Sequence, residues 1–387
     1  MKCLFLSNFF NHHQKSLADA MYELMGDDYH FIATSSMPNF RKELGYPELS
    51  EPYVLIYNNE SREVINKMVN DADVVIYGAA PLSMIKKRCI EGKLTFCYSE
   101  SLYKSIYKYL KWPINAYKSY WIHRCFLLCA SAYAPFDYML SGIQLNKCFR
   151  WGYFTSLREY NSIEVLKEKK RRKGKKYISI LWVGRLIELK HPEAALYVAN
   201  KLKKEHIDFE LKIIGSGKLE NRIRSAISKQ QLGDRVKMLG SMSTDEVRKY
   251  MENADIFLFT SDRHEGWGAV LNESMNSGCA VVADENIGSA KYLINPGKNG
   301  LIYKSQNYED LYAKVKWLIE HPNEAIEMGI EAYLTILNVW NGKNAASKFM
   351  ALSESLLEGR GVSPINIGPC SNAPLIMRRF KGLFPIL

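Results

Sequence analysis

Short runs of β-branched or aromatic residues alternate with segments of helical periodicity along most of this 387-residue chain. That alternation is typical of βαβ units, in which crossover helices join parallel strands, so it predicts an α/β fold. In the first part of the chain the predicted strands are 3–7, 29–34, 73–77 and 94–98, and the predicted helices are 14–25, 62–70 and 116–130.

A second series of the same kind begins after a run rich in lysine and arginine, 167–176, which holds eight cations and one acid. Its predicted strands are 177–183, 209–214, 236–239, 256–260 and 279–283, and its predicted helices are 192–204, 219–230, 245–252 and 270–277. We therefore expect two similar units joined by a basic linker, and a binding patch is the alternative interpretation of that run. The expected divisions are 1–155, the linker 156–176, 177–340, and 341–387 with a helix returning to the first unit and a tail.

The charge of the chain limits the classes of partner that it is expected to bind. It carries 52 Lys and Arg against 41 Asp and Glu, a net charge of +11, which favours anionic partners such as nucleic acid, an acidic membrane or phosphorylated small molecules. Apolar residues at 47% and charged residues at 24% are ordinary for globular proteins, which excludes disorder, collagen and coiled coil. We find no nucleic-acid recognition module, so we expect no nucleic-acid partner.

Cysteine use and hydropathy bear on the compartment. The eight cysteines include no C-x-x-C pair and mostly lie in apolar runs, which indicates buried thiols in a reducing cytosol. The apolar run at the amino end stops at Ser7, too early for a signal peptide. No apolar run reaches the roughly 18 residues of a membrane span. We expect a cytoplasmic protein, soluble or peripheral on the inner face of the membrane.

The most informative stretch is 264–278, which follows the predicted strand 256–260. Its glycines allow a tight turn before a helix that begins near Ala269, and the unpaired amides of a helix start can bind a phosphate. Glu265 precedes those amides and Glu273 follows them by about one helical turn. Two carboxylates flanking an anion site suit a ligand with hydroxyls at both ends and a diphosphate between them. The alternative is a glycine-rich turn followed by a helix with an exposed glutamate.

A second group of charges follows the predicted strand 177–183. Gly184 is followed by Arg185 and, five residues later, by Lys190. Arginine offers a planar pair of donors and lysine a point charge, and together they match a diphosphate. Cations after strands are usually solvated. This group therefore indicates a binding site only in combination with the two glutamates in the same unit.

Residues 177–350 resemble the nucleotide-binding half of retaining GT-B glycosyltransferases of glycosyltransferase family 4. The matching features are Val183-Gly184-Arg185 with Lys190, the segments 213–217, 236–240 and 253–255, and the Glu-x7-Glu pattern 265–273. The resemblance implies two Rossmann-like domains facing each other across a cleft, with the acceptor bound by the first and the nucleotide sugar by the second.

The resemblance also implies roles for individual residues. Arg185 and Lys190 hold the donor diphosphate, and Glu265 with the amides of Gly266, Trp267 and Gly268 holds the hexose. The amides of Ala269 and Val270 meet the phosphates and Glu273 the ribose hydroxyls, while Gly184 and Gly215 belong to the donor-binding loops. The nucleotide diphosphate sugar is a co-substrate, and no metal or other cofactor is expected.

The first unit matches the family less well. Family members often have a glycine-rich loop after the first strand and a histidine after the fourth, whereas this chain has the glycine-free loop 8–14 and Glu100. Glu100 either orients the acceptor hydroxyl or faces the cation developing at the anomeric carbon, or else it complements a helix start. His12 and His13, at a strand end, are candidates for binding acceptor or donor phosphate, with a structural role as the alternative. The stretch 147–154 is similar to enzymes that assemble bacterial surface polysaccharides.

Two further patterns predict no site. Asp71-Ala72-Asp73 matches a D-x-D metal motif but precedes its strand, which indicates a helix end. Gly215-x-Gly217 lacks the third glycine of a nicotinamide site, because Glu220 stands there.

The expected activity is hexose transfer with retention, from a nucleotide diphosphate sugar to a glycan or lipid-linked hydroxyl. A nucleotide-sugar epimerase and a non-catalytic nucleotide-binding subunit are the alternatives. The cationic tail could lie on a membrane, pack, or be disordered.

Overall fold

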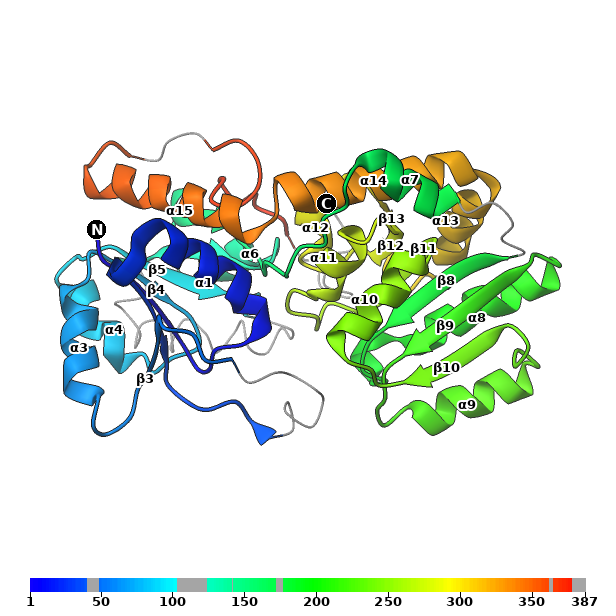
Figure 1. Ribbon diagram of the computed structural model, residues 1–387, viewed down its shortest axis with the longest axis horizontal. Helices are drawn as coiled ribbons and strands as arrows, with labels where there is room; N and C mark the ends of the chain where they lie inside the picture. Colours follow the sequence, from blue (N-terminus) through cyan, green and yellow to red (C-terminus); the bar gives the residue numbers. More distant parts are fainter. Residues whose placement is uncertain (40–48, 103–123, 141, 172–176, 362–364, 378–387) are drawn as a thin grey trace.

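The computed structural model describes residues 1–39, 49–102, 124–140, 142–171, 177–361 and 365–377. These residues form two parallel β-sheets, each covered by helices, and the two units lie side by side along the long axis of the molecule (Figure 1). The expected α/β class with two Rossmann-like units is confirmed.

The first sheet has seven described strands in the order β3-β2-β1-β4-β5-β6-β7, and all its pairings are parallel. The order reverses between β1 and β4, and the carboxyl ends of the strands at such a point form the crevice where ligands bind. The strands are β1 (Cys3–Ser7), β2 (Tyr29–Ala33), β3 (Val54–Ile56), β4 (Val74–Tyr77), β5 (Thr95–Ser99), β6 (Phe126–Cys129) and β7 (Cys148–Arg150).

One predicted helix of this unit is wrong where the structure describes it. The prediction covered 116–130, but residues 126–129 form strand β6, paired with β5 and β7. A short apolar run shows no measurable period, so a buried strand and a buried helix cannot be separated by pattern alone. The remainder of the predicted helix, 116–123, lies outside the described residues.

The second sheet has six described strands, again all parallel, in the order β10-β9-β8-β11-β12-β13. Here the order reverses between β8 and β11. The strands are β8 (Ile178–Val183), β9 (Phe209–Ile214), β10 (Val236–Gly240), β11 (Ile256–Phe259), β12 (Ala280–Asp284) and β13 (Leu301–Tyr303). All five strands predicted for this unit are present, with ends that differ by one residue at most.

Helices cover both sheets (Figure 1). Pro192 occupies the first turn of α8, and Ser243 and Glu246 close a capping box before α10, as expected. The helices are α1 (His12–Met25), α3 (Arg62–Asp71), α4 (Ser83–Ile90), α6 (Ala134–Met139), α7 (Ile163–Arg171), α8 (Pro192–Lys204), α9 (Glu220–Lys229), α10 (Thr244–Asn253), α11 (Val270–Met275), α12 (Ala290–Leu293), α13 (Tyr308–Glu320), α14 (Pro322–Asn338) and α15 (Gly342–Leu357). The described part of the chain also has the short 3-10 helices η1 (Gly26–Asp28), η3 (Leu145–Lys147) and η4 (Glu188–Lys190).

The basic run is not a solvated linker over its first part. Residues up to Arg171 belong to α7, which packs against α14. Leu166 is buried, and the buried Lys170 Nζ donates to the carbonyl oxygen of Ala254 at 2.9 Å. The linker prediction fails here because the stretch carries an amphipathic helix whose cations have specific acceptors. Residues 172–176 lie outside the described residues.

The two units share a packed interface beside the cleft. One hydrophobic cluster contains residues of both sheets, and within it the rings of Tyr292 and Trp340 stack with centroids 5.9 Å apart. Trp267 lies beside both rings and is 1% exposed. The chain also returns to the first unit, because α15 packs against α1 (Figure 1). Large aromatic contacts of this kind fix the relative placement of the sheets.

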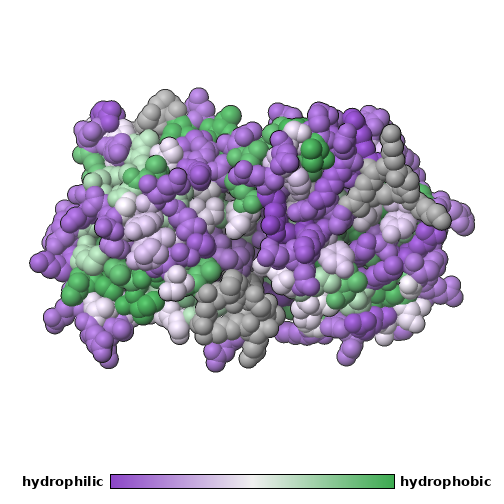
Figure 2. Space-filling view, viewed as in Figure 1, coloured by the Kyte–Doolittle hydropathy of each residue, from purple (hydrophilic) through white to green (hydrophobic). Residues whose placement is uncertain are grey.

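The burial of the cysteines and the hydropathy of the surface agree with the composition. All eight cysteines are buried with free thiols, as expected. The molecular surface in Figure 2 is mostly hydrophilic, with hydrophobic areas in separate patches on both units. Within the described ranges, no helix combines the length and apolar character that crossing a bilayer requires.

Candidate active site

A cleft of about 920 Å³ lies between the two units. Because parallel strands place their carboxyl ends on one edge, the loops after β1, β5, β8 and β11 meet there. Every candidate residue from the sequence lines this cleft, namely His12, His13, Glu100, Gly184, Arg185, Lys190, Gly215, Glu265, Gly266, Trp267, Gly268, Ala269, Val270 and Glu273. Residues up to 261 positions apart in the chain, His12 and Glu273, are thus brought into one site.

The loop between β11 and α11 forms the floor of the cleft on the side of the second unit. Gly268 has a φ of +79°, a backbone conformation that glycine adopts at no steric cost, and α11 begins at Val270. The Trp267 indole points into the domain interface, where its Nε1 donates to Asn272 Oδ1 at 2.8 Å. Packing of this side chain therefore anchors a loop whose backbone lines the cleft.

Lys190 and Glu265 form an ion pair in the cleft. The Lys190 Nζ donates to the Glu265 carboxylate, and the two side chains are 14% and 13% exposed. Thr260 ties the same loops together, because its hydroxyl donates to the Lys190 carbonyl at 2.7 Å. Arg185 differs, because it is exposed on the cleft wall. The lysine has three donors, so its contact with Glu265 leaves capacity for phosphate oxygens.

Glu100 reaches across the cleft from the first unit. Its Oε1 accepts a hydrogen bond from the Tyr153 hydroxyl at 2.6 Å. A Cβ atom placed at Gly266 would lie 2.0 Å from Glu100 Oε2, so only glycine fits without displacing the carboxylate. Glu100 therefore lies against the loop that carries Glu265. The alternative role at a helix start concerns the segment 103–123, which is outside the described residues.

His12 and His13 begin α1 at the carboxyl end of β1. Asn11 and Gln14 form a capping box around this helix start, which fixes where the two imidazoles emerge. The histidine rings lie with centroids 3.9 Å apart, and His13 stacks on Tyr153 at 5.8 Å. The histidines, Tyr153 and Glu100 thus form one contiguous wall.

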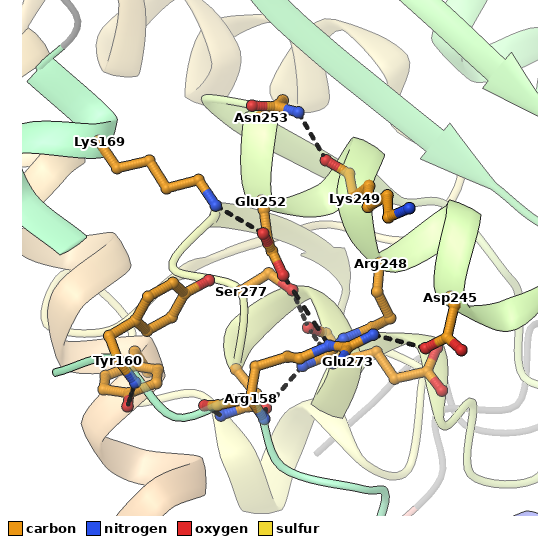
Figure 3. A network of polar contacts seen from close by, with 12 residues as sticks. Arg158, Tyr160, Lys169, Asp245, Arg248, Lys249, Glu252, Asn253, Glu273 and Ser277 are labelled. Atoms are coloured by element: carbon orange, nitrogen blue, oxygen red, sulfur yellow. Dashed lines mark hydrogen bonds and ion pairs between the residues drawn. The ribbon is translucent and has the colours of Figure 1, made fainter. Parts of the chain in front are cut away.

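Glu273 lies in the first turn of α11, in a network with α10 (Figure 3). Arg248 Nη1 donates to the Glu273 backbone carbonyl at 2.7 Å, and Ser277 Oγ donates to the same oxygen at 2.8 Å. Burial raises the pKa of the Glu273 carboxyl above its usual value, and the nearby Arg248 guanidinium opposes that shift. Figure 3 also shows Arg158 reaching Asp245, at 2.6 Å, which ties the chain before α7 to the start of α10.

The two patterns set aside from the sequence have structural roles. Asp71 ends α3 and Asp73 precedes β4, at the opposite edge of the sheet from the cleft, where Asp73 accepts the Lys2 amide at 2.7 Å. Gly215 has a φ of +131°, and a Cβ there would lie 2.0 Å from the Gly184 carbonyl oxygen, so it permits close approach of two loops. In the part of the chain that is described, no three His, Cys, Asp or Glu side chains are grouped to hold a metal ion.

Sequence reasoning missed three contributors to the site. Tyr153 contacts Glu100 from a segment that leaves β7, and nothing in its local sequence marks that contact. His191 and Asp262 contact each other at 3.2 Å between the two donor-side loops. A signal existed for His191 alone, since it follows directly after Lys190, but its backbone conformation and partners come from tertiary structure.

Part of the chain matches a known protein family. Residues 163–335 match the family described as Glycosyl transferases group 1. This stretch contains the complete second sheet and every candidate donor-side residue. The first unit lies outside the match.

Individual relatives align with part of the chain. The amylovoran biosynthesis glycosyltransferase AmsK of Erwinia amylovora is 37% identical over 116 residues, which are 29% of this chain and 28% of that protein. The N-acetylgalactosamine-N,N'-diacetylbacillosaminyl-diphospho-undecaprenol 4-alpha-N-acetylgalactosaminyltransferase of Campylobacter jejuni is 30% identical over 141 residues, 36% of this chain and 37% of that protein. The chain thus aligns with about a third of the length of these curated relatives.

The complete architecture has solved counterparts. The crystal structure of Anabaena Alr3699/HepE in complex with UDP superposes with a TM-score of 0.68 at 14% identity, covering 92% of this chain and 100% of that one. At this identity the likeness establishes the fold, which is GT-B.

Proposed function

We propose that this protein is a retaining, metal-independent glycosyltransferase of family 4 that moves a hexose from a nucleotide diphosphate sugar to a hydroxyl of a glycan or lipid-linked acceptor. One observation carries the proposal. Arg185, Lys190, Glu265 and Glu273 line one face of the interdomain cleft, and Glu100 reaches that face from the other unit. The family match over 163–335 supports the transferase class.

In this proposal each part of the donor contacts a different group on the charged face. Arg185 and Lys190 hold the diphosphate, Glu265 and the backbone of 266–268 the hexose, Ala269 and Val270 the phosphates, and Glu273 the ribose hydroxyls. The raised pKa of Glu273 indicates a carboxylate with incomplete solvation, which gains hydrogen bonds when ribose hydroxyls donate to it. HepE, which shares the fold, was crystallised with UDP, and a uridine nucleotide is our first choice of donor.

Catalysis is electrostatic in this proposal. Negative charge develops on the leaving diphosphate as its bond to the sugar breaks, and Arg185 and Lys190 stabilise it in place. Lys190 already contacts Glu265, so one side chain links the leaving group to the hexose site. Departure and attack on the same face of the sugar would retain the anomeric configuration without a covalent intermediate. Closure of the cleft excludes water and limits hydrolysis of the donor.

Glu100 replaces the histidine that family members often carry. It lies against Gly266, next to the proposed hexose site, and its carboxylate is oriented by the Tyr153 hydroxyl. Both roles considered from the sequence remain compatible with this place: orienting the acceptor hydroxyl and facing the developing cation. His12 and His13 line the adjoining wall, where an acceptor or a donor phosphate would contact them.

The proposal for the acceptor is based on the names of the relatives. The names of AmsK and of the Campylobacter jejuni enzyme refer to amylovoran biosynthesis and to a diphospho-undecaprenol substrate, respectively. We propose a role in surface polysaccharide biosynthesis, with the enzyme in the cytoplasm and peripheral on the inner membrane face. Its +11 charge would then favour anionic lipid. Binding to anionic liposomes should weaken with salt, and salt-insensitive or absent binding would reject the membrane part.

The alternatives make different predictions. A nucleotide-sugar epimerase changes the donor in the absence of acceptor, and a non-catalytic subunit binds nucleotide without turnover. Neither is favoured, since the curated relatives above are named as transferases. Incubating donor alone, and then with acceptor, separates the three.

The central test combines binding and turnover. Nucleotide sugars are screened for thermal stabilisation, because a ligand at about 100 times its Kd adds roughly 2.7 kcal/mol. The stabilising donor is then used with the variants Arg185→Ala and Glu265→Ala. Arg222→Ala is the matched control, because Arg222 is 68% exposed and contacts Glu188 rather than the cleft. Folded cleft variants with full transfer would reject the site, and absence of stabilisation by any nucleotide sugar would reject the donor class.

A further inference from the structure

His191 holds an unusual backbone conformation beside the proposed diphosphate site. It follows Lys190 directly and has φ 46° and ψ 55°, in the left-handed region that residues with a Cβ rarely adopt. Such a conformation is strained for a residue with a Cβ and persists only where surrounding contacts determine it. Backbone hydrogen bonds with Glu188, Ala194 and Thr260 hold this residue in place, and its imidazole ring adds two further contacts.

Both ring nitrogens of His191 contact carboxylates. Nδ1 lies 3.0 Å from Glu193 Oε1 in the first turn of α8, and Nε2 lies 3.2 Å from Asp262 Oδ2 in the loop after β11. Two carboxylate acceptors require both nitrogens to donate, so the ring is an imidazolium. A cation shared by two acids joins the loop after β8 to the loop after β11.

Asp262 is also hydrogen-bonded to the loop that carries Glu265. Its Oδ1 accepts from the His264 amide at 2.7 Å, and the Glu265 amide donates to its backbone carbonyl at 3.0 Å. The Asp262 amide in turn donates to the Leu189 carbonyl at 3.0 Å. Asp262 is therefore connected to the residue before Lys190 and to Glu265 itself.

We propose that His191 is a positioning residue: as an imidazolium between Glu193 and Asp262, it holds the β8 and β11 loops together so that Lys190 and Glu265 meet in the geometry that binds the donor. This proposal rests on the proposed function for what the two residues bind. The clamp itself is a property of the fold and can be tested without a substrate. His191 touches no substrate in this proposal and acts only through its neighbours.

The electrostatics support a permanent charge. Hydrogen bonds to Asp262 and then to Glu193 raise the pKa of His191 to about 10, although burial opposes this. Burial disfavours ionisation of Asp262, yet hydrogen bonds from His191 and His264 lower its pKa to about 2. Two tyrosines also face this cluster: Tyr308 of α13, whose hydroxyl donates to Glu193 at 3.2 Å, and Tyr303 of β13, whose pKa the Glu193 charge helps to raise. While Glu193 and Asp262 are ionised, the stability that the clamp contributes is complete below the ordinary histidine pKa of about 6.5 and is lost as pH rises through about 10.

The first experiment observes the clamp directly. In protein with ¹⁵N-labelled histidine, both ring nitrogens of His191 should stay protonated at pH 8, where an ordinary histidine is neutral. Hydrogen exchange of the peptide covering 262–268 should accelerate in His191→Asn, since asparagine tolerates the left-handed backbone but carries no charge. A His191 ring that titrates near pH 6.5, or an unchanged exchange rate, would overturn the proposal whether or not the protein transfers sugar.

The second experiment measures the consequence for the site. His191→Asn and Asp262→Asn should each lower kcat/KM about 10- to 100-fold, as small misplacements of reacting groups do. The double variant should lose no more than the worse single variant, because one connection is broken in all three. His206→Asn is the matched control, since His206 also has a positive φ, 58°, but is exposed and remote from the cleft.

The outcomes separate the two proposals. A merely structural His191 would lower the melting temperature and leave kcat/KM of the folded fraction unchanged, which would refute positioning. Additive losses in the double variant would also refute it. If the wild-type protein shows the protonated ring and the protected loop but neither binds nor transfers any sugar, the clamp stands and the proposed function fails.

Discussion

The two walls of the cleft are built differently. On the second unit, the candidate residues come from two short stretches, 184–190 and 265–273, plus Gly215, and most of them are charged groups or loop backbone. On the first unit, they come from three separated places: His12 and His13, Glu100, and Tyr153 in the crossover after β7. Among the described residues of the first wall, aromatic and imidazole rings surround one carboxylate, that of Glu100.

This contrast indicates where recognition is constrained. A diphosphate sugar has fixed charges at fixed spacing, so a compact pattern on two neighbouring loops can bind it. An acceptor varies, and its wall is assembled from side chains whose proximity depends on the whole fold. Variants on the second wall should therefore affect donor chemistry, and variants on the first should affect transfer to the acceptor.

The largest effect is expected for Lys190→Ala on the second wall. Loss of a preorganised cation at the leaving group should lower kcat about 10²- to 10³-fold. Initial rates of nucleotide release with acceptor present give the measurement. Lys218→Ala, a lysine on the same unit that does not line the cleft, is the control. If the kcat of the Lys190 variant lay within a few-fold of the wild-type value, the second wall would not stabilise the leaving group electrostatically as proposed.

Glu100→Gln should have the next largest effect, on the first wall. The amide keeps the shape and can still accept from the Tyr153 hydroxyl, but it loses the charge near the hexose site. We expect transfer to fall about 10- to 100-fold, in the usual range for a positioned acid or base, with nucleotide affinity unchanged. Calorimetry with the free nucleotide and a transfer assay test both halves. Equal losses in nucleotide affinity and transfer would contradict the assignment of donor binding to the second wall and acceptor transfer to the first.

Glu273→Gln separates affinity from stability on the second wall. We expect nucleotide affinity to fall about 10-fold and the melting temperature to rise, because a partly buried carboxylate is costly while it remains ionised. Since the folded pKa of Glu273 is raised, its ionised form destabilises the protein above the ordinary glutamate pKa, and that penalty disappears as pH falls. The gain in melting temperature should therefore shrink at acid pH. A lowered melting temperature at pH 7.5 would contradict the burial argument.

The smallest effect is expected for Tyr153→Phe. Removing the hydroxyl takes one hydrogen bond from Glu100 but keeps the ring that stacks on His13. Transfer should fall about 3- to 10-fold, the equivalent of one hydrogen bond to a charged group. In the Glu100→Gln background the same change should have a smaller effect. An unchanged effect in both backgrounds would show that Tyr153 acts independently of Glu100.

The sequence predicted the second unit better than the first for a physical reason. Its strands are separated by regular amphipathic helices with clear start signals such as Pro192 and the Ser243 capping box. In the first unit, β3, β6 and β7 have only three or four residues each, too few to show a period. Its short buried strands are defined by their neighbours in the sheet rather than by their own pattern.

The sequence by itself determined the α/β class and which loops would carry the charged residues, because periodicity and strand-end placement are local properties. Tertiary structure alone decided that Lys190 pairs with Glu265, that Glu100 lies against Gly266, and that His191 bridges two carboxylates. Each of these contacts joins separate elements or loops, and its geometry depends on how parallel strands bring their carboxyl ends to a common edge. The helix α7 shows the same limit, since only packing reveals that Lys170 is buried.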